Sequence, residues 1–171
     1  MGWAAFFILS PFAFRLALMR VRLIWVGRTR DAHLRALVDE YLKRLGRFAR
    51  CEVTELRESV ARTEREGIED EGRRIISALR SDALAVLLDV EGREWGSREL
   101  AAEVERWQVN GTKEAAFIIG GPYGVAAEVI ERVNLRWSLS RLTLTHEMAR
   151  VVLVEQLYRA YTIIHGLPYQ K

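Results

Sequence analysis

Two uninterrupted apolar runs, residues 83–88 and 115–119, constrain the fold of this chain more than any other feature. Both faces of a strand formed by either run would be apolar, as is typical of strands buried on both sides in a parallel sheet. The segment between them carries Leu100, Val104 and Trp107 at helical spacing. A strand, a helix and a second strand in this order predict a parallel α/β sheet.

The same alternation runs along the chain, and we find no internal repeat, linker or low-complexity segment. The 171 residues, half of them apolar, can bury the core of a single domain. Ser97 is the expected N-cap of the helix between the two apolar runs. The expected strands are 20–26, 51–56, 83–88, 115–119 and 137–140, and the other expected helices are 31–47, 59–79, 125–133 and 145–164.

The first eighteen residues, MGWAAFFILSPFAFRLAL, differ in composition from the rest of the chain. They are almost wholly apolar, are interrupted by Pro11 and carry one charge, on Arg15. This stretch is too short and broken to predict a membrane-spanning helix, and it lacks the basic start of a secretory signal. We expect a single domain over residues 19–171 that begins at Met19, with residues 1–18 an extension from a misassigned start. A membrane anchor is the alternative interpretation of this extension.

Positive charge is concentrated in two regions of the sequence. Residues 20–50 carry nine cations against three anions, and residues 132–171 carry six against two. Between them, residues 51–72 carry three cations and eight anions. Of the 26 cationic residues 23 are arginine, whose planar fork suits phosphate. This balance is consistent with a nucleic-acid partner, although a GC-rich genome that favours Arg codons would produce the same composition.

The chain contains a single cysteine, Cys51, so it forms no internal disulfide. This fits a reducing compartment. The histidines and the cysteine do not cluster at metal-ligand spacing, and no metal site is predicted.

The segment FIIGGPYGV, residues 117–125, places three glycines directly after a buried strand. Ligands of open α/β sheets bind outside the carboxyl ends of the strands, and glycines there let a ligand approach the main chain. The segment matches neither the G-x-G-x-x-G fingerprint nor a P-loop, so a pyrophosphate site is not expected. Taken alone, the segment is either part of a ligand site or only a strand-to-helix turn.

A second unusual pattern sets small polar residues among leucines just before the last predicted helix. The spacing is poor for an amphipathic strand. It suits a segment whose backbone grips a ligand while the leucines wall that ligand in. The small polar residues are Ser138, Ser140, Thr143 and Thr145.

Four stretches together, LLDVEGREW, FIIGGPYGV, LSRLTLTHEMARVVLVEQLYRA and the closing PYQK, resemble the ribosomal large-subunit pseudouridine N3-methyltransferases of the SPOUT superfamily. The resemblance runs from about Met19 to Lys171. It implies a parallel-sheet α/β fold with a deep C-terminal trefoil knot, S-adenosylmethionine as cofactor and a symmetric homodimer. The implied substrate is a pseudouridine in helix 69 of 23S rRNA, within the assembled ribosome of the cytoplasm.

The resemblance also implies which residues would hold the cofactor. Gly120 would offer bare backbone because a nucleoside, rather than a phosphate, lies against it. Leu88 would end a strand against the cofactor, and a knotted loop would surround the adenine and ribose. That loop comprises Leu139, Ser140, Arg141, Leu142, Thr143 and Leu144.

Three residues are candidates for the chemistry of methyl transfer. His146 opens the last predicted helix, although a histidine there could simply bond to a neighbouring loop. Arg150, one turn on, could hold a phosphate or a carboxylate, and Tyr169 could stack on a flipped base. The family usually has a histidine where this chain has Gln170, so the identity of the general base stays open. The alternatives to this function are a SPOUT methyltransferase with another RNA target and a non-catalytic, ribosome-associated nucleotide-binding module.

Overall fold

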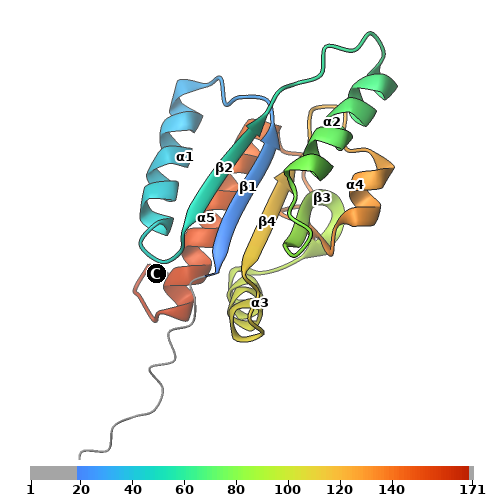
Figure 1. The fold of residues 1–171 in the computed structure, drawn as a ribbon. Helices are drawn as coiled ribbons and strands as arrows, with labels where there is room; N and C mark the ends of the chain where they lie inside the picture. Colours follow the sequence, from blue (N-terminus) through green and yellow to red (C-terminus); the bar gives the residue numbers. More distant parts are fainter. Residues whose placement is uncertain (1–18, 170–171) are drawn as a thin grey trace, which may run out of the picture.

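The computed structural model describes residues 19–169, which form a five-stranded sheet and five helices. All described strand pairs are parallel, and the strand order is β2-β1-β4-β3-β5 (Figure 1). The strands are β1 (Arg20–Val26), β2 (Cys51–Leu56), β3 (Leu84–Glu94), β4 (Glu114–Ile119) and β5 (Leu135–Ser138). The predicted parallel α/β architecture is therefore confirmed.

The helices divide between the two faces of this sheet, with α1, α3 and α5 on one face and α2 and α4 on the other (Figure 1). Parallel strands all run in the same direction, so the chain must cross back over the sheet before it enters each new strand. A helix usually makes this crossing, which is why strands and helices alternate. The helices are α1 (Ala32–Leu45), α2 (Glu64–Ala78), α3 (Ser97–Val109), α4 (Ala127–Arg132) and α5 (His146–Ile164).

The core has two halves because the central strand β4 is apolar on both faces. Phe117 packs with β1, α3 and α5, whereas Ile118 packs with α2 and α4. Both side chains are completely buried. Side chains alternate between the faces of a strand, so an unbroken apolar run places apolar groups in both halves.

Several element boundaries differ from the sequence prediction, most of them by one or two residues. Helix α2 begins at Glu64 with Thr63 as its N-cap, because Ser59 is held in the preceding loop by hydrogen bonds to Asp70 and Glu71. Gly96, not Ser97, is the N-cap of α3, and the Ser97 hydroxyl donates instead to Gln156 on α5 at 2.8 Å. The last strand, β5, ends at Ser138.

Strand β3 extends six residues beyond its apolar run, to Glu94. Its register against β5 shifts between Leu88 and Arg93, both of which pair with Trp137. Gly92 permits this close pairing, because a Cβ there would lie 2.6 Å from the backbone of Arg136. This extension is mostly polar, so the hydrophobic pattern of the sequence did not predict it.

Candidate functional site

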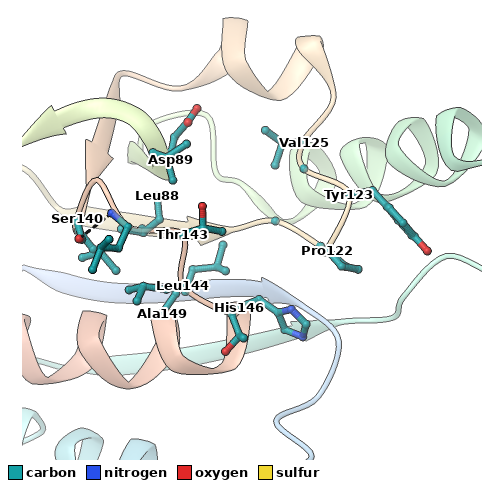
Figure 2. A pocket seen from close by; sticks show the side chains of 18 of the residues that line it. Leu88, Asp89, Pro122, Tyr123, Val125, Ser140, Thr143, Leu144, His146 and Ala149 are labelled. Carbon is teal, nitrogen blue, oxygen red and sulfur yellow. Dashed lines mark hydrogen bonds between the residues drawn. The ribbon is translucent and has the colours of Figure 1, made fainter.

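A cavity of about 700 Å³ lies beyond the carboxyl end of β4 and beside the middle of the neighbouring strand β3, where the apolar run of β3 ends. Three segments provide most of its lining: the middle of β3, the glycine loop after β4, and the segment between β5 and α5 (Figure 2). Leu88 was expected to end its strand, but β3 continues past it to Glu94. These segments are residues 88–90, 119–125 and 139–146, and Ile130 of α4 and Ala149 of α5 complete the lining. The two patterns singled out in the sequence thus form one site.

The glycine loop closes on itself in a tight turn. The amide of Gly124 donates to the carbonyl of Gly121 at 3.1 Å, and Gly124 has a φ of +99° that favours glycine. A Cβ on Gly120 would lie 2.5 Å from Cγ1 of Val125 and 3.0 Å from the Gly124 carbonyl oxygen. The bare backbone at Gly120 is therefore needed for the loop to fold back, a reason that the sequence pattern did not reveal.

Small polar residues hold the 139–146 segment in shape. The Ser138 hydroxyl donates to the carbonyl of Ser140, and the Ser140 hydroxyl accepts from the Leu142 amide, both at 3.0 Å. Thr145 caps α5 by accepting from the Met148 amide at 3.3 Å. Because these polar groups are engaged with the backbone, the leucines between them are left to wall the cavity.

Most residues predicted to bind a cofactor line this one cavity, and Arg141 is the exception. Its side chain is 90% exposed and lies 3.5 Å from the carboxylate of Glu94. The predicted residues that line the cavity are Leu88, Gly120, Leu139, Ser140, Leu142, Thr143 and Leu144. Asp89, Tyr123, Val125, Ile130 and Ala149 also line the cavity but were not predicted individually as binding residues. Tyr123 and Val125 belong to the glycine segment 117–125, and Asp89 follows an apolar run at the edge of the sheet where ligands are expected, so the sequence pattern already pointed to these three.

The cavity carries almost no charge. Asp89 is the only acidic residue in its lining, and the lining contains no lysine or arginine. The Asp89 carboxylate accepts from the Arg136 guanidinium at 2.7 and 2.9 Å and from the Glu91 amide at 3.0 Å. A site without cations is unsuited to a polyphosphate, and it can accept a neutral nucleoside or a ligand with positive charge.

Of the three predicted catalytic residues, only His146 lines the cavity. It is the first residue of α5, and Figure 2 shows its ring beside Pro122. Its neighbour Glu147 faces the connection between β1 and α1, where its carboxylate accepts from the amides of Arg30 at 3.0 Å and Asp31 at 3.1 Å. The start of α5 thus connects the cavity to the end of β1.

Arg150 lies inside the protein and does not line the cavity. Its guanidinium donates to the Val26 carbonyl at 2.6 Å and to the Thr29 hydroxyl at 2.9 Å. It also lies over the Trp25 ring, 5.2 Å from the centroid. Burial lowers the pKa of Arg150, an effect opposed by the nearby charge of Glu147. Arg150 is therefore placed to support the end of β1 rather than to contact a ligand in the cavity of its own chain.

Tyr169 lies at the far end of α5 from His146. Its ring packs against Tyr158, with ring centroids 4.8 Å apart. Tyr158 follows His146 by twelve residues on α5, a separation of about 18 Å along the helix axis at 1.5 Å per residue. The Tyr169 hydroxyl donates to Glu155 at 3.1 Å and lies 3.2 Å from the Tyr41 hydroxyl. Burial, followed by the hydrogen bond with Tyr41, raises the pKa of Tyr169, so its hydroxyl stays protonated.

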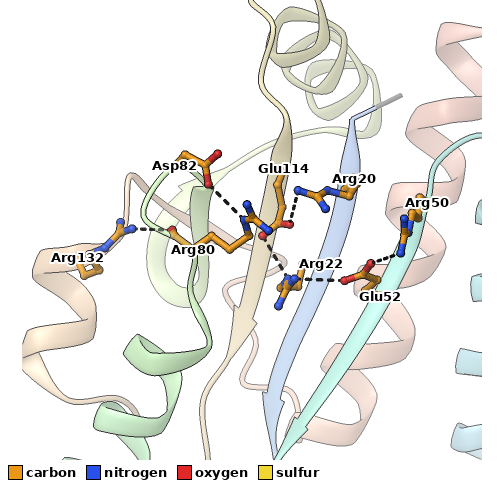
Figure 3. Close-up of polar contacts among 8 residues, drawn as sticks. All are labelled: Arg20, Arg22, Arg50, Glu52, Arg80, Asp82, Glu114 and Arg132. Atoms are coloured by element: carbon orange, nitrogen blue, oxygen red, sulfur yellow. Dashed lines mark hydrogen bonds and ion pairs between the residues drawn. The ribbon is translucent and has the colours of Figure 1, made fainter. Parts of the chain in front are cut away.

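Several arginines of the first basic region are held in ion pairs at the amino edge of the sheet (Figure 3). The buried carboxylate of Glu114 lies 3.5 Å from the Arg20 guanidinium and 3.2 Å from that of Arg22. Glu52 pairs with Arg22 at 3.2 Å and with Arg50 at 3.0 Å. Part of the positive charge counted in the sequence therefore stabilises the sheet edge opposite the cavity.

Two classes of site receive no support from the described residues. Burial raises the pKa of the Cys51 thiol to about 11, which leaves it protonated and a poor nucleophile. Residues 19–169 contain no cluster of three or more potential metal ligands.

Within residues 19–169, every helix is too short or too polar to cross a membrane. Residues 1–18, on which the expectation of an extension rests, lie outside the described residues.

Comparison with known proteins identifies the family. A family model described as predicted SPOUT methyltransferase matches residues 19–170. The ribosomal RNA large subunit methyltransferase H of Gloeobacter violaceus is 43% identical over 151 residues, which cover 88% of this chain and 98% of the relative. The chain belongs to the SPOUT methyltransferase family. The resemblance seen in the sequence motifs is thereby confirmed.

Other SPOUT relatives are similar over nearly their whole length. The protein of the same name from Geotalea daltonii is 40% identical over 151 residues, covering 88% of this chain and 99% of the relative. The one from Streptococcus pneumoniae is 38% identical over 159 residues, covering 90% of this chain and all of the relative. The SPOUT fold implies a C-terminal trefoil knot, and the parallel sheet, with the 139–146 segment and the end of β4 lining one cavity, is consistent with that fold.

Proposed function

We propose that this protein transfers a methyl group from S-adenosylmethionine to N3 of a pseudouridine in helix 69 of 23S rRNA, on assembled ribosomes in the cytoplasm. The observation that carries the proposal is the cavity formed by residues 88–90 of β3, the glycine loop and the 139–146 segment of a SPOUT methyltransferase. The choice of RNA is supported by relatives named for large-subunit ribosomal RNA and by the resemblance of the motifs.

The cavity fits this cofactor in size and in charge. Its volume of about 700 Å³ lies within the range of small-molecule sites. The adenosine part is uncharged, which matches a lining without lysine or arginine. The sulfonium and ammonium groups are cationic, and the lining places no cation against them; its one acidic side chain, Asp89, already pairs with Arg136. Bound there, S-adenosylmethionine would supply an electrophilic methyl group.

The residues of the chain would bind and orient this cofactor. Leu88, Leu142 and Leu144 would enclose it and exclude water, while Ser140 keeps the segment folded through its hydrogen bond with the Leu142 amide. The backbone at Gly120 would lie along the ligand. A cofactor held in one pose places the methyl group in line with the attacking nitrogen, which is the main contribution expected of such a site.

We assign His146 to the acceptor side of the reaction. As the bond from N3 to the methyl carbon forms, the bond from that carbon to the cofactor sulfur would break, which leaves S-adenosylhomocysteine. N3 would lose its proton in the same reaction, and an imidazole can accept that proton. His146 is the only imidazole in the cavity lining. Arg150 and Glu147 would then act as positioning residues, because their hydrogen bonds hold the β1–α1 connection against the helix that carries His146.

We further propose that the protein is a symmetric homodimer in which Tyr169 completes the site of the partner subunit. Within one chain Tyr169 packs against Tyr158, about 18 Å along α5 from His146 at 1.5 Å per residue, and it does not line the cavity. A second copy with its α5 antiparallel would bring the two together. The basic regions of both subunits would then be available to grip the rRNA.

The test combines cofactor binding with methyl transfer. Calorimetry should detect one S-adenosylmethionine per chain, and incubation with 70S ribosomes should place one methyl group on a helix 69 pseudouridine, read by mass spectrometry of the rRNA. Methylation of a different RNA would favour the first alternative, and cofactor binding without methyl transfer would favour the second. Ribosomes from a strain that lacks the gene should be unmethylated at the same position.

A further inference from the structure

Tyr123 is the one tyrosine of the described chain that is set apart from other side chains. Its side chain lines the cavity rim, and the residue is 64% exposed. The described residues offer it neither an aromatic contact nor a hydrogen bond to its hydroxyl. By contrast, Tyr41 packs against Tyr158, Tyr158 against Tyr169, and Tyr161 against Phe48.

The backbone that carries this ring is constrained. Tyr123 lies between Pro122, whose ring fixes its own φ, and Gly124, which adopts a positive φ. The turn is closed by the hydrogen bond from the Gly124 amide to the Gly121 carbonyl. Folding therefore holds a large aromatic ring in solvent at the rim of the cavity, where little backbone entropy remains to be lost when a ligand contacts it.

The direction of the ring distinguishes it from the residues that enclose the cavity. Figure 2 shows Tyr123 projecting outward beyond Pro122, whereas Leu88, Thr143 and Leu144 lie around the interior. A ring in that place would not contact a cofactor enclosed by the leucines. It would meet a planar group that arrives at the mouth from outside.

We infer that Tyr123 is a positioning residue that stacks on the nucleobase next to the methyl-accepting base of the RNA. The inference rests on the proposed function. The acceptor base must enter the cavity mouth, so its neighbour in the strand passes the rim where the exposed ring lies. Bases stack on aromatic side chains largely irrespective of sequence. The acceptor would therefore have to lie in an unpaired loop, because a base within a duplex cannot turn its face to the ring.

The experiment measures single-turnover methylation of 70S ribosomes over a range of ribosome concentrations. Tyr123→Ala should raise the half-saturating ribosome concentration by about 5-fold to 150-fold, the range that corresponds to base–aromatic stacking of about 1–3 kcal/mol. Tyr123→Phe and Tyr123→Trp should remain within about 2-fold of the wild type, because both keep the ring. S-adenosylmethionine affinity, measured by calorimetry, should be unchanged in all three variants.

Val109→Ala is the matched control, because Val109 is 70% exposed at the end of α3 and does not line the cavity. It should behave as the wild type. Equal half-saturation for Tyr123→Ala and the wild type would overturn the inference, as would equal loss in Tyr123→Ala and Tyr123→Phe. A Tyr123→Ala protein that changes oligomeric state in sedimentation would show that the ring contacts a second subunit instead. If the wild-type protein does not methylate ribosomes, the proposed function is wrong. Failure of the proposed function can therefore be told apart from failure of the inference about Tyr123, which concerns only the variants.

Discussion

The guanidinium of Arg150 on α5 donates a 2.6 Å hydrogen bond to the carbonyl of Val26, the last residue of β1. This contact joins segments 124 residues apart in the sequence. It also leaves a cation completely buried, with polar partners in Val26 and Thr29 and an aromatic one in Trp25. Removing only the arginine would lower the stability of the fold, because the two buried acceptors would lose their donor and could not hydrogen-bond to water instead.

Replacing Arg150 with methionine should therefore destabilise the protein. The substitution keeps most of the side-chain volume but leaves the Val26 carbonyl and the Thr29 hydroxyl without their donor. We expect the free energy of unfolding to fall by about 2 kcal/mol or more, measured by urea denaturation. Arg65→Met is the control, since that side chain is 89% exposed and pairs only with Glu69, and it should change stability little. Equal stability of both variants would contradict the assigned role of Arg150.

The Glu147 carboxylate should make the protein sensitive to acid. Hydrogen bonds from the Arg30 amide, and then from the Asp31 amide, lower the pKa of Glu147 below its ordinary value of 4.5. A lowered pKa in the folded state stabilises the protein above the unfolded-state pKa, and this contribution is lost as the pH falls from about 4.5 through the folded-state pKa.

Urea denaturation at a series of pH values tests this expectation. Glu147→Gln should flatten the decline in stability below pH 4.5, because the glutamine cannot be protonated. Glu105→Gln, on the exposed face of α3, should keep the decline of the wild type. An unchanged slope in Glu147→Gln would show that other carboxylates govern the acid response.

A side chain at Gly120 should disturb the cavity through the loop. The Cβ of Gly120→Ala would meet the Val125 side chain at 2.5 Å and the Gly124 carbonyl at 3.0 Å, so residues 121–125 must move. We expect at least 10-fold weaker S-adenosylmethionine binding by calorimetry, equal to about 1.4 kcal/mol. Gly120→Val should weaken it further. Gly67→Ala on α2, where a Cβ would find only ordinary contacts, should bind as the wild type.

The C-terminal tail should act on the partner subunit. Removal of residues 168–171 should leave cofactor affinity and dimerisation nearly intact and reduce methyl transfer steeply. Tyr169→Ala alone should weaken RNA binding by about 1–3 kcal/mol if the ring stacks on the substrate base. If the protein is a monomer in solution, the tail cannot act on a partner subunit and the prediction fails.

Mixed dimers decide whether the tail acts in this way. A chain that carries His146→Ala and a chain that lacks residues 168–171 should each be nearly inactive alone. Co-expressed with different affinity tags and purified as a heterodimer, they should recover activity, because one site then combines an intact His146 with a tail from the other chain. No recovery would place the tail and His146 in the same subunit's site.

The domain that begins at Met19 should be self-sufficient. The Met19 side chain is 1% exposed in the core, and the Arg20 amide donates to the Lys113 carbonyl at 3.0 Å, so the fold is engaged from the start of β1. A chain that begins at Met19 should match the full chain in thermal stability and in methyl transfer. Aggregation of the shorter chain alone would assign a structural role to residues 1–18, and membrane association of the full chain alone would support the anchor.

The sequence alone predicted the α/β class, a strand at each of the five places in the chain, and two of the three segments that line the cavity. A strand with an unbroken apolar run, such as β4, must be buried on both faces. A few consecutive residues are enough to show this, so the sequence predicts it. The glycine loop and the 139–146 segment were predicted to bind the same ligand from their sequence motifs. Each motif is a continuous stretch of sequence, so it can be recognised without the tertiary structure.

Only the tertiary structure decided which polar residues serve the site. Arg150 and His146 lie one helical turn apart, and the sequence gives no sign that one is buried beneath β1 while the other faces the cavity. The position of Tyr169 likewise depends on the length of α5 and on a packing cluster with Tyr41 and Tyr158. Contacts between distant segments determine whether a side chain is buried and where it points, so two polar residues one helical turn apart can have different roles: Arg150 is a hydrogen-bond donor in the core and His146 lines the cavity.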